Sequence, residues 1–384
     1  MNFIQRGFTG KNNSWMYILT MVIIFVAIQF ASIPLMLAAF FKVEGDMEKF
    51  IKGAEASFMN IGMNSSLYLF LMIFTFMIGL LALYVCVRFI HKKKFVAIVT
   101  SREKVDRNRI LFAFVLWGSI SVVAILIGVF LAPENYSWNF KPIPFFTLLF
   151  VSFVFLPFQT SSEELIFRGY LMQGFGLAST KKSFSFNVIY LFACTLLLIT
   201  INNYFELLTL VNLVLIIAFG VTLFFLHDFK IIDKFHETKL SKNLYKVFNR
   251  NLTPLIATSV IFGLLHGMNP EVEKLGYILM VFYIGTGLFY GITTLMDEGT
   301  EIALGLHASN NIVAAFLVTT DWMVFRTDAL YIDTSEPAVT AEMFIGVFVL
   351  YPLLLFIFSK KYGWKNWKEK LTGKVEIPLI NDSE

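Results

Sequence analysis

Ten apolar runs, most of them long enough to cross a lipid bilayer, constrain this 384-residue chain more than any other feature. They lie near residues 15–41, 66–90, 110–131, 144–172, 184–201, 206–226, 252–268, 276–296, 302–319 and 342–359. A transmembrane helix requires about 20 predominantly apolar residues, and a helix satisfies its own backbone hydrogen bonds in lipid. Because several runs are short or contain polar residues, we expect an all-α polytopic membrane protein, a helical bundle of about eight to ten transmembrane helices.

The overall composition supports this fold class. Hydrophobic residues make up 57% of the chain and charged residues 15%, whereas soluble domains have about 45–50% and about 25%. The first apolar run, 15–41, is too long for a signal-peptide core and is expected to remain as the first span. A net charge of only +4 gives no basis for nucleic-acid binding. The two cysteines, Cys86 and Cys194, lie in apolar runs and predict neither a disulfide framework nor a cysteine zinc site.

The distribution of lysine and arginine predicts the orientation. If the N-terminus is cytoplasmic, the inside segments carry 24 of these residues and the outside loops carry six. The positive-inside rule therefore places both termini in the cytoplasm. The basic stretch Lys92–Asn108 is either an amphipathic segment on the inner membrane surface or a solvated loop.

The first polar cluster within an apolar run is Gln159-Thr-Ser-Ser-Glu163-Glu164-Leu-Ile-Phe-Arg168. Charged side chains inside spans are costly and usually functional. Glu164 and Arg168 are four residues apart, so they share a helix face and can pair. Glu163 points about 100° away and is left free to act as a base. A plain salt bridge that pairs helices is the alternative, but it leaves the second glutamate unexplained.

Two further clusters lie in later spans. Phe262 and His266 share one helix face in Phe-Gly-Leu-Leu-His, and His307 and Asn311 share one in His-Ala-Ser-Asn-Asn. Each cluster alone is also explained by packing or by hydrogen bonds between helices. Together with the first cluster they place two carboxylates, an arginine, two histidines and an asparagine on three helices. We expect these side chains to share one wet cavity suited to peptide-bond hydrolysis.

The three motifs together resemble those of the CPBP family of intramembrane proteases, which includes eukaryotic CAAX prenyl endopeptidases and bacterial Abi (bacteriocin-immunity) proteins. The family pattern reads Glu-Glu-x-x-x-Arg, Phe-x-x-x-His and His-x-x-x-Asn, and it stands here as Glu163-Glu164-Leu-Ile-Phe-Arg168, Phe262-Gly-Leu-Leu-His266 and His307-Ala-Ser-Asn-Asn311. The segment Gly285–Gly291 also looks like the family's glycine-rich span. The resemblance covers about residues 140–320 and implies a bacterial-type member in the bacterial inner (plasma) membrane.

The resemblance also implies roles for these residues. Glu163 and His266 would activate the attacking water, while His307 and Asn311 would stabilise the oxyanion. Glu164 and Arg168 would shape the cavity and balance its charge. No cofactor is certain: a metal-free glutamate mechanism fits the residues, and a zinc site at Glu163, His266 and His307 stays open. The implied substrate is a membrane-embedded or lipid-anchored peptide or protein.

The chain departs from the family pattern at residues 182–250, where the connection between the first two motifs is usually short. The predicted division is 1–139 for N-terminal helices and a basic loop, 140–320 for the protease core with this insertion, and 321–384 for the last span and a polar tail. The insertion either gates substrate or pads the bundle. Simple topology also sets Glu163 and His307 nearer the inner side and His266 nearer the outer side, and a helix break at Pro157, a tilt or a re-entrant segment would reconcile them.

Two other functions compete with the endopeptidase. A non-catalytic scaffold or bacteriocin-immunity-type protein would use the same fold to hold a partner. A transporter would use the buried charges as an ion site, although the inverted repeats common in transporters are not visible in the sequence.

Overall fold

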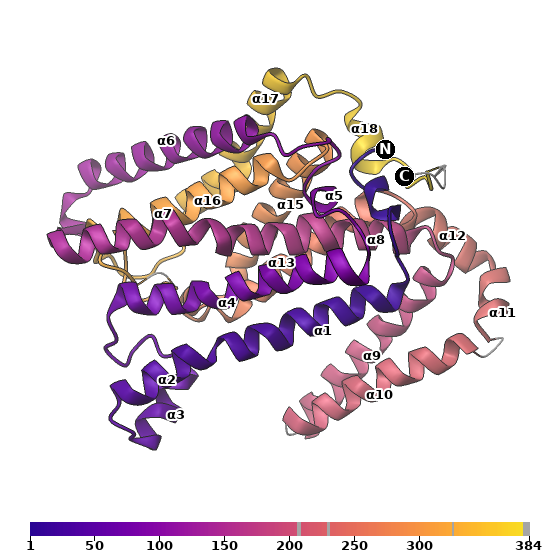
Figure 1. Ribbon diagram of the computed structural model, residues 1–384, viewed down its shortest axis with the longest axis horizontal. Helices are drawn as coiled ribbons and strands as arrows, with labels where there is room; N and C mark the ends of the chain where they lie inside the picture. Colours follow the sequence, from indigo (N-terminus) through magenta and orange to yellow (C-terminus); the bar gives the residue numbers. More distant parts are fainter. Residues whose placement is uncertain (206–208, 229–230, 325, 379–384) are drawn as a thin grey trace.

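Long helices that run roughly side by side form most of the structure (Figure 1), a computed structural model that describes residues 1–205, 209–228, 231–324 and 326–378. The helices that coincide with the predicted apolar runs are α1 (Ser14–Ala31) with α2 (Ile33–Lys42), α4 (Ser65–Val85), α6 (Arg107–Leu131), α7 (Pro142–Glu164) with α8 (Met172–Ser179), α9 (Ser183–Phe205), α10 (Thr209–Asp228), α13 (Leu252–Leu265), α15 (Met280–Asp297), α16 (Glu301–Phe316) and α17 (Tyr351–Tyr362). The predicted all-α fold class is confirmed.

Several helices are suited to a bilayer by length and composition. Among the described residues, six helices qualify as spans: Ser14–Lys42, Ser65–Ile90, Arg107–Leu131, Pro142–Ser179, Ser183–Asn202 and Tyr277–Asp297. Leu252–Met268 is a shorter apolar helix of the same kind. Their outward faces carry large apolar side chains, among them Phe25, Phe130 and Ile143, at 63%, 83% and 82% exposure. Such a surface is stable only against lipid, so the chain is a multi-pass membrane protein.

Short elements complete the bundle. The remaining helices are α3 (Met47–Glu55), α5 (Val96–Val99), α11 (Ile231–Glu237), α12 (Lys239–Phe248), α14 (Pro270–Leu275) and α18 (Trp367–Thr372). Strands β1 (Tyr136–Trp138), β2 (Val318–Thr319) and β3 (Tyr331–Asp333) form a small sheet in the order β1-β3-β2. Strand β3 pairs antiparallel with β1 and parallel with β2. The N-terminus and α18, the last helix, lie at one end of the bundle, here called the terminal end, and α2 and α3 lie at the opposite, distal end (Figure 1).

The predicted helix break at Pro157 is wrong. Helix α7 runs through Pro157 as far as Glu164. Proline removes one backbone donor, but α7 packs against both α4 and α16, and tertiary packing of this kind outweighs the local preference. The irregularity comes after the glutamates instead, where η4 (Leu165–Leu171) is a π-helix that continues into α8. Such π segments are often found at functional sites.

Helix α16 lies at the centre of the packing, because it contacts α6, α7 and α15. Its close approach to α6 depends on Gly305, which faces the backbone carbonyl of Ile110. All but one of the α16 residues from Glu301 to Val313 are buried. The sequence therefore places His307 and Asn311 on the most enclosed helix of the bundle.

Substituting Gly305 with alanine will destabilise the bundle by about 1–3 kcal/mol, the usual cost of overpacking. The added Cβ would overlap the carbonyl oxygen of Ile110, so α6 and α16 must separate. The thermal unfolding midpoint of the purified protein in detergent measures the effect. Gly220→Ala is the matched control, because no atom lies within 4 Å of its added Cβ on α10. An equal response of the two variants would contradict the packing account.

The inserted helices α9 and α10 project from the rest of the bundle at the terminal end, at the lower right of Figure 1. Only 6% of the most apolar stretch of Ser183–Asn202 is buried inside the protein. Among the described residues, α9 and α10 pack mainly on each other and on α8, α11 and α12. The division of the chain into three regions remains a prediction.

Candidate active site within the helical bundle

A buried ion pair forms the base of the candidate site. Arg168 of η4 is fully buried, and its Nη1 lies 3.1 Å from Oε1 of the equally buried Glu164. The Arg168 Nη2 donates to the carbonyl oxygen of Gly287 on α15 at 3.3 Å. Its guanidinium also lies 4.0 Å from the centre of the Phe262 ring. The predicted pairing of Glu164 with Arg168 is present, and it ties the glutamate helix to α13 and α15.

His307 of α16 contacts both glutamates. Its Nδ1 lies 2.8 Å from Oε1 of Glu164 and its Nε2 lies 3.6 Å from Oε2 of Glu163. Because a carboxylate only accepts hydrogen bonds, the assigned proton on Nδ1 points at Glu164. The Nε2 atom is therefore directed at Glu163. The Tyr290 ring lies 5.4 Å from the imidazole and covers another side of it.

Glu163 is held on one oxygen only. Its Oε1 accepts a hydrogen bond of 2.6 Å from Nε2 of Gln159, one turn earlier on α7. Its buried Oε2 has no hydrogen-bond partner in the described protein. Asn311 of α16 donates to Oε1 of Gln159 at 2.9 Å, so the glutamine joins Asn311 to Glu163. Sequence reasoning gave Gln159 no role; its position four residues before Glu163 was the available signal.

His266 and His307 both contact the Phe262 ring. The Phe262 ring is 4.6 Å from the His266 ring and 6.2 Å from the His307 ring, measured between centroids. The His266 Nδ1 bonds to the Phe262 carbonyl oxygen at 2.8 Å, which leaves Nε2 directed elsewhere. Five of the predicted site residues therefore contact one another directly or through a single intervening residue: Glu163, Glu164, Arg168, His307 and Asn311. His266 contacts Phe262, which also contacts His307, and among the described residues it forms no hydrogen bond with Glu163.

The zinc alternative does not fit this arrangement. Among the residues that the structure describes, no three His, Cys, Asp or Glu side chains are grouped so that they could hold a metal ion. The His307 Nε2 faces Glu163, but His266 contacts Phe262 and is not grouped with these two side chains. We derive no step through a metal at Glu163, His266 and His307.

The basic stretch Lys92–Asn108 packs into the protein over 95–102 and at Lys93, while Lys92, Lys94, Lys104 and Arg107 are exposed. The Lys93 Nζ donates to the carbonyl oxygen of Gly7 at 3.0 Å, and burial lowers the pKa of Lys93 to about 8. Helix α5 is buried against η4. Thr100 pairs through its backbone with Gly299, at the turn between α15 and α16.

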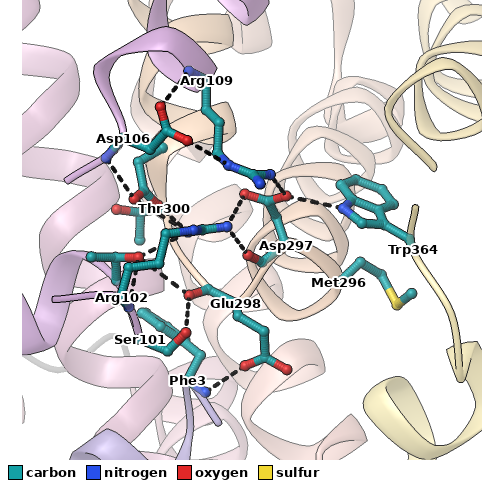
Figure 2. Close-up of polar contacts among 12 residues, drawn as sticks. Phe3, Ser101, Arg102, Asp106, Arg109, Met296, Asp297, Glu298, Thr300 and Trp364 are labelled. Carbon is teal, nitrogen blue, oxygen red and sulfur yellow. Dashed lines mark hydrogen bonds and ion pairs between the residues drawn. The ribbon is translucent and has the colours of Figure 1, made fainter. Parts of the chain in front are cut away.

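The same stretch contributes to a charged cluster at the terminal end, which sequence reasoning missed (Figure 2). The Arg102 guanidinium lies 2.9 Å from Oδ2 of Asp297 and 3.2 Å from Oε2 of Glu301, and Arg109 also pairs with Asp297. The two carboxylates are 1% and 0% exposed. Trp364 donates to Asp297 at 3.0 Å. Because Asp297 ends α15 and Glu301 begins α16, the cluster fixes the turn that leads to His307.

Replacing Asp297 with asparagine will destabilise the protein by about 2–3 kcal/mol, because two arginines lose a buried charged acceptor. Thermal unfolding in detergent provides the measurement. Asp46→Asn is the control, since Asp46 pairs with Lys49 on an exposed helix and asparagine also caps helices. Equal midpoints for the Asp297 variant and the wild type would show that the cluster does not hold the turn.

Comparison with known proteins supports the family predicted from the motifs. Residues 238–313 match the family model described as type II CAAX prenyl endopeptidase, Rce1-like. The match includes His266, His307 and Asn311 and excludes the segment of Glu163. The chain is also similar to the uncharacterized protein YyaK of Bacillus subtilis (strain 168), with 24% identity over 323 residues, 83% of each chain. No solved structure matches the chain significantly. The predicted resemblance to this family is confirmed.

Proposed function

We propose that this chain, a multi-pass membrane protein of the CAAX-protease type, is an intramembrane endopeptidase that hydrolyses a peptide bond through water activated by Glu163. The observation that carries the proposal is the pair formed by Glu163 Oε2 and His307 Nε2, 3.6 Å apart. Both atoms are hydrogen-bond acceptors when the imidazole is neutral and protonated on Nδ1. One water molecule can donate a hydrogen to each of them at this separation.

Hydrolysis then requires two proton transfers, the formation of one carbon–oxygen bond and the breaking of one carbon–nitrogen bond. Glu163 takes a proton from the water as the water oxygen bonds to the carbonyl carbon of the substrate. The resulting tetrahedral intermediate collapses as its carbon–nitrogen bond breaks. The proton passes from Glu163 to the departing amine nitrogen, so the carboxylate is restored. The hydrogen bond from Gln159 holds Glu163 in one orientation throughout.

The contacts favour a modified division of roles. The motifs assign water activation to Glu163 and His266 and the oxyanion to His307 and Asn311. Because His307 faces Glu163 directly, we assign His307 to the water. Asn311, which reaches the site through Gln159, supplies a donor for the oxyanion. The Nδ1 of His266 donates to the Phe262 carbonyl oxygen, so its bare Nε2 is an acceptor and is assigned to a hydrogen bond from the leaving amine.

Glu164 and Arg168 support His307 without taking part in proton transfer. Glu164 accepts from Nδ1 of His307, which sets the tautomer. Arg168 compensates the charge of Glu164 inside the bundle. A carboxylate beside an imidazole in this manner orients the ring and raises its basicity.

The proposed substrate is a membrane-embedded or lipid-anchored peptide or protein, reached from the bilayer of a bacterial plasma membrane. Both termini lie in the cytoplasm in this proposal, as the lysine and arginine distribution predicts. A hollow of about 1510 Å³ opens at the distal end beside the turn after His266, and Met268 and Pro270 are among its lining residues. Its lining contains side chains of both charges, which suits a polar peptide segment that leaves the membrane.

Comparison of membrane peptides from cells that make the wild-type protein or Glu163→Gln tests the proposal. New peptide termini are expected only with the wild type, and the uncleaved precursor is expected to accumulate or co-purify with the variant. Identical peptide profiles at equal protein levels would reject the endopeptidase and leave the non-catalytic scaffold. Solute flux in vesicles that is lost in the same variant would instead favour a transporter.

A further inference from the structure

Glu271 is a buried carboxylate that the proposed reaction does not use. It lies on α14, directly after the turn that follows His266, and it is 5% exposed. Within the described part of the chain, no lysine, arginine or histidine forms an ion pair with it. A buried carboxylate without a cation is costly unless several donors satisfy it. The hydrogen bonds to Glu271 must therefore offset the cost of burying its charge.

Three donors reach Glu271 from three different segments. The Tyr283 hydroxyl on α15 donates to Oε1, and Nδ2 of Asn269 donates to the same oxygen at 3.1 Å. The backbone N–H of Val324, in the loop after β2, donates to Oε2 at 3.2 Å. Both oxygens are thus used. Glu271 joins the turn after α13, the start of α15 and the loop after β2 around one point.

These hydrogen bonds lie next to His266, because Tyr283 contacts both Glu271 and His266. The Tyr283 ring stacks on the imidazole, with centroids 4.6 Å apart and an angle of 24° between the planes. Phe262 contacts the imidazole at the same centroid distance but a steeper angle of 51°. The His266 Nδ1 is bonded to the Phe262 carbonyl. Two rings and one hydrogen bond therefore restrict the imidazole and leave Nε2 as its unbonded nitrogen.

We propose that Glu271 and Tyr283 are positioning residues that hold the His266 imidazole in its working orientation. The inference rests on the proposed function, in which the Nε2 of His266 accepts a hydrogen bond from the leaving amine. Tyr283 acts through its ring, and Glu271 acts through the Tyr283 hydroxyl. Within the described part of the chain, both residues meet the site through the His266 ring, and neither forms a hydrogen bond or ring contact with Glu163 or His307.

The positioning of His266 depends on the carboxylate of Glu271 and on the ring and hydroxyl of Tyr283. A glutamine at position 271 would place an NH₂ group among three donors, so one of those hydrogen bonds is lost. A phenylalanine at position 283 keeps the stacked ring but removes the donor to Glu271. An alanine at position 283 removes the ring as well. A displacement of about 1 Å in a catalytic group can cost about 10²-fold in rate.

Kinetics of purified protein in liposomes test the inference, with the membrane peptide that accumulates in Glu163→Gln cells as substrate. Glu271→Gln and Tyr283→Phe are expected to lower kcat by about 10-fold, and Tyr283→Ala by about 100-fold, with KM nearly unchanged. Glu237→Gln is the matched control, because Glu237 is an exposed glutamate at the end of another short helix, α11, away from the distal hollow. Its kcat is expected to equal that of the wild type.

A second measurement needs no substrate and detects His266 itself. Solid-state nitrogen-15 spectra of histidine-labelled protein in bilayers, with the signal assigned by its loss in His266→Ala, report the tautomer. The wild type is expected to show one Nδ1-protonated tautomer, and Tyr283→Ala a mixture of both tautomers. An unchanged spectrum in a folded Tyr283→Ala protein would overturn the inference.

The outcomes separate this inference from the proposed function. If Glu163→Gln and His266→Ala cleave at the wild-type rate, the proposed function fails. If those two variants are inactive while Glu271→Gln and both Tyr283 variants keep the wild-type kcat, only the positioning role fails. Should Glu271→Gln not fold, Tyr283→Phe still decides the case, because it retains the buried ring.

Discussion

Cleavage is expected to fall by about 10²–10⁴-fold when Glu163 is replaced by glutamine, the range that general-base catalysis contributes. Glutamine keeps the size of the side chain and can still accept the hydrogen bond from Gln159 through its own oxygen. It cannot take a proton from water. The rate of peptide cleavage by purified protein in liposomes measures the loss, with protein folding followed by thermal unfolding of the same preparations.

The control for this variant is Glu48→Gln on the exposed helix α3. That protein should cleave at the wild-type rate, and both variants should unfold at the wild-type temperature. A Glu163→Gln protein that is folded and cleaves within a few-fold of the wild type would mean that another group activates the water.

Removal of the Arg168 side chain is expected to cost about 3–5 kcal/mol of folding stability, because it breaks a buried ion pair. Arg168→Ala leaves Glu164 buried without its cation and leaves the Gly287 carbonyl without its donor. The unfolding midpoint in detergent and the amount of folded protein in membranes measure the effect. Arg168→Lys should recover only part of the stability, because one ammonium group cannot reproduce both contacts and the planar stack on Phe262.

A double variant distinguishes the loss of the cation from the loss of packing. Glu164→Gln combined with Arg168→Met removes both charges and keeps similar volumes, so it should be more stable than Arg168→Ala alone. Arg107→Ala, at an exposed position at the start of α6, should unfold as the wild type does. A double variant less stable than Arg168→Ala would contradict the assignment of the effect to an unpaired charge.

Two kinds of feature were predictable from the sequence: those that follow from helix periodicity, and those that follow from the free-energy cost of placing charged groups in lipid. Apolar runs identify the long helices, since lipid permits few other backbone structures. The pairing of Glu164 with Arg168 follows from a spacing of four residues, and it persists although η4 is a π-helix. The gathering of Glu163, His307 and Asn311 follows from the cost of exposing polar groups to hydrocarbon.

Features that depend on long-range contacts were not predictable. Arg102 lies 195 residues from Asp297, and no local pattern indicates their pairing. The continuous helix through Pro157 reflects packing on two sides, which overrides a local breaker. The contact between Tyr283 and Glu271 depends on a turn whose geometry the spacing does not specify. The orientation of the termini in the membrane remains a prediction, because it rests on the charge distribution alone.

Hydrolysis in water enriched in oxygen-18 tests the central claim most directly. Purified wild-type protein in liposomes, given the accumulated membrane peptide, should release a product whose new carboxyl terminus carries one oxygen-18 atom, and Glu163→Gln should release almost none. Equal amounts of labelled product from the wild type and Glu163→Gln would contradict the claim that Glu163 activates the attacking water.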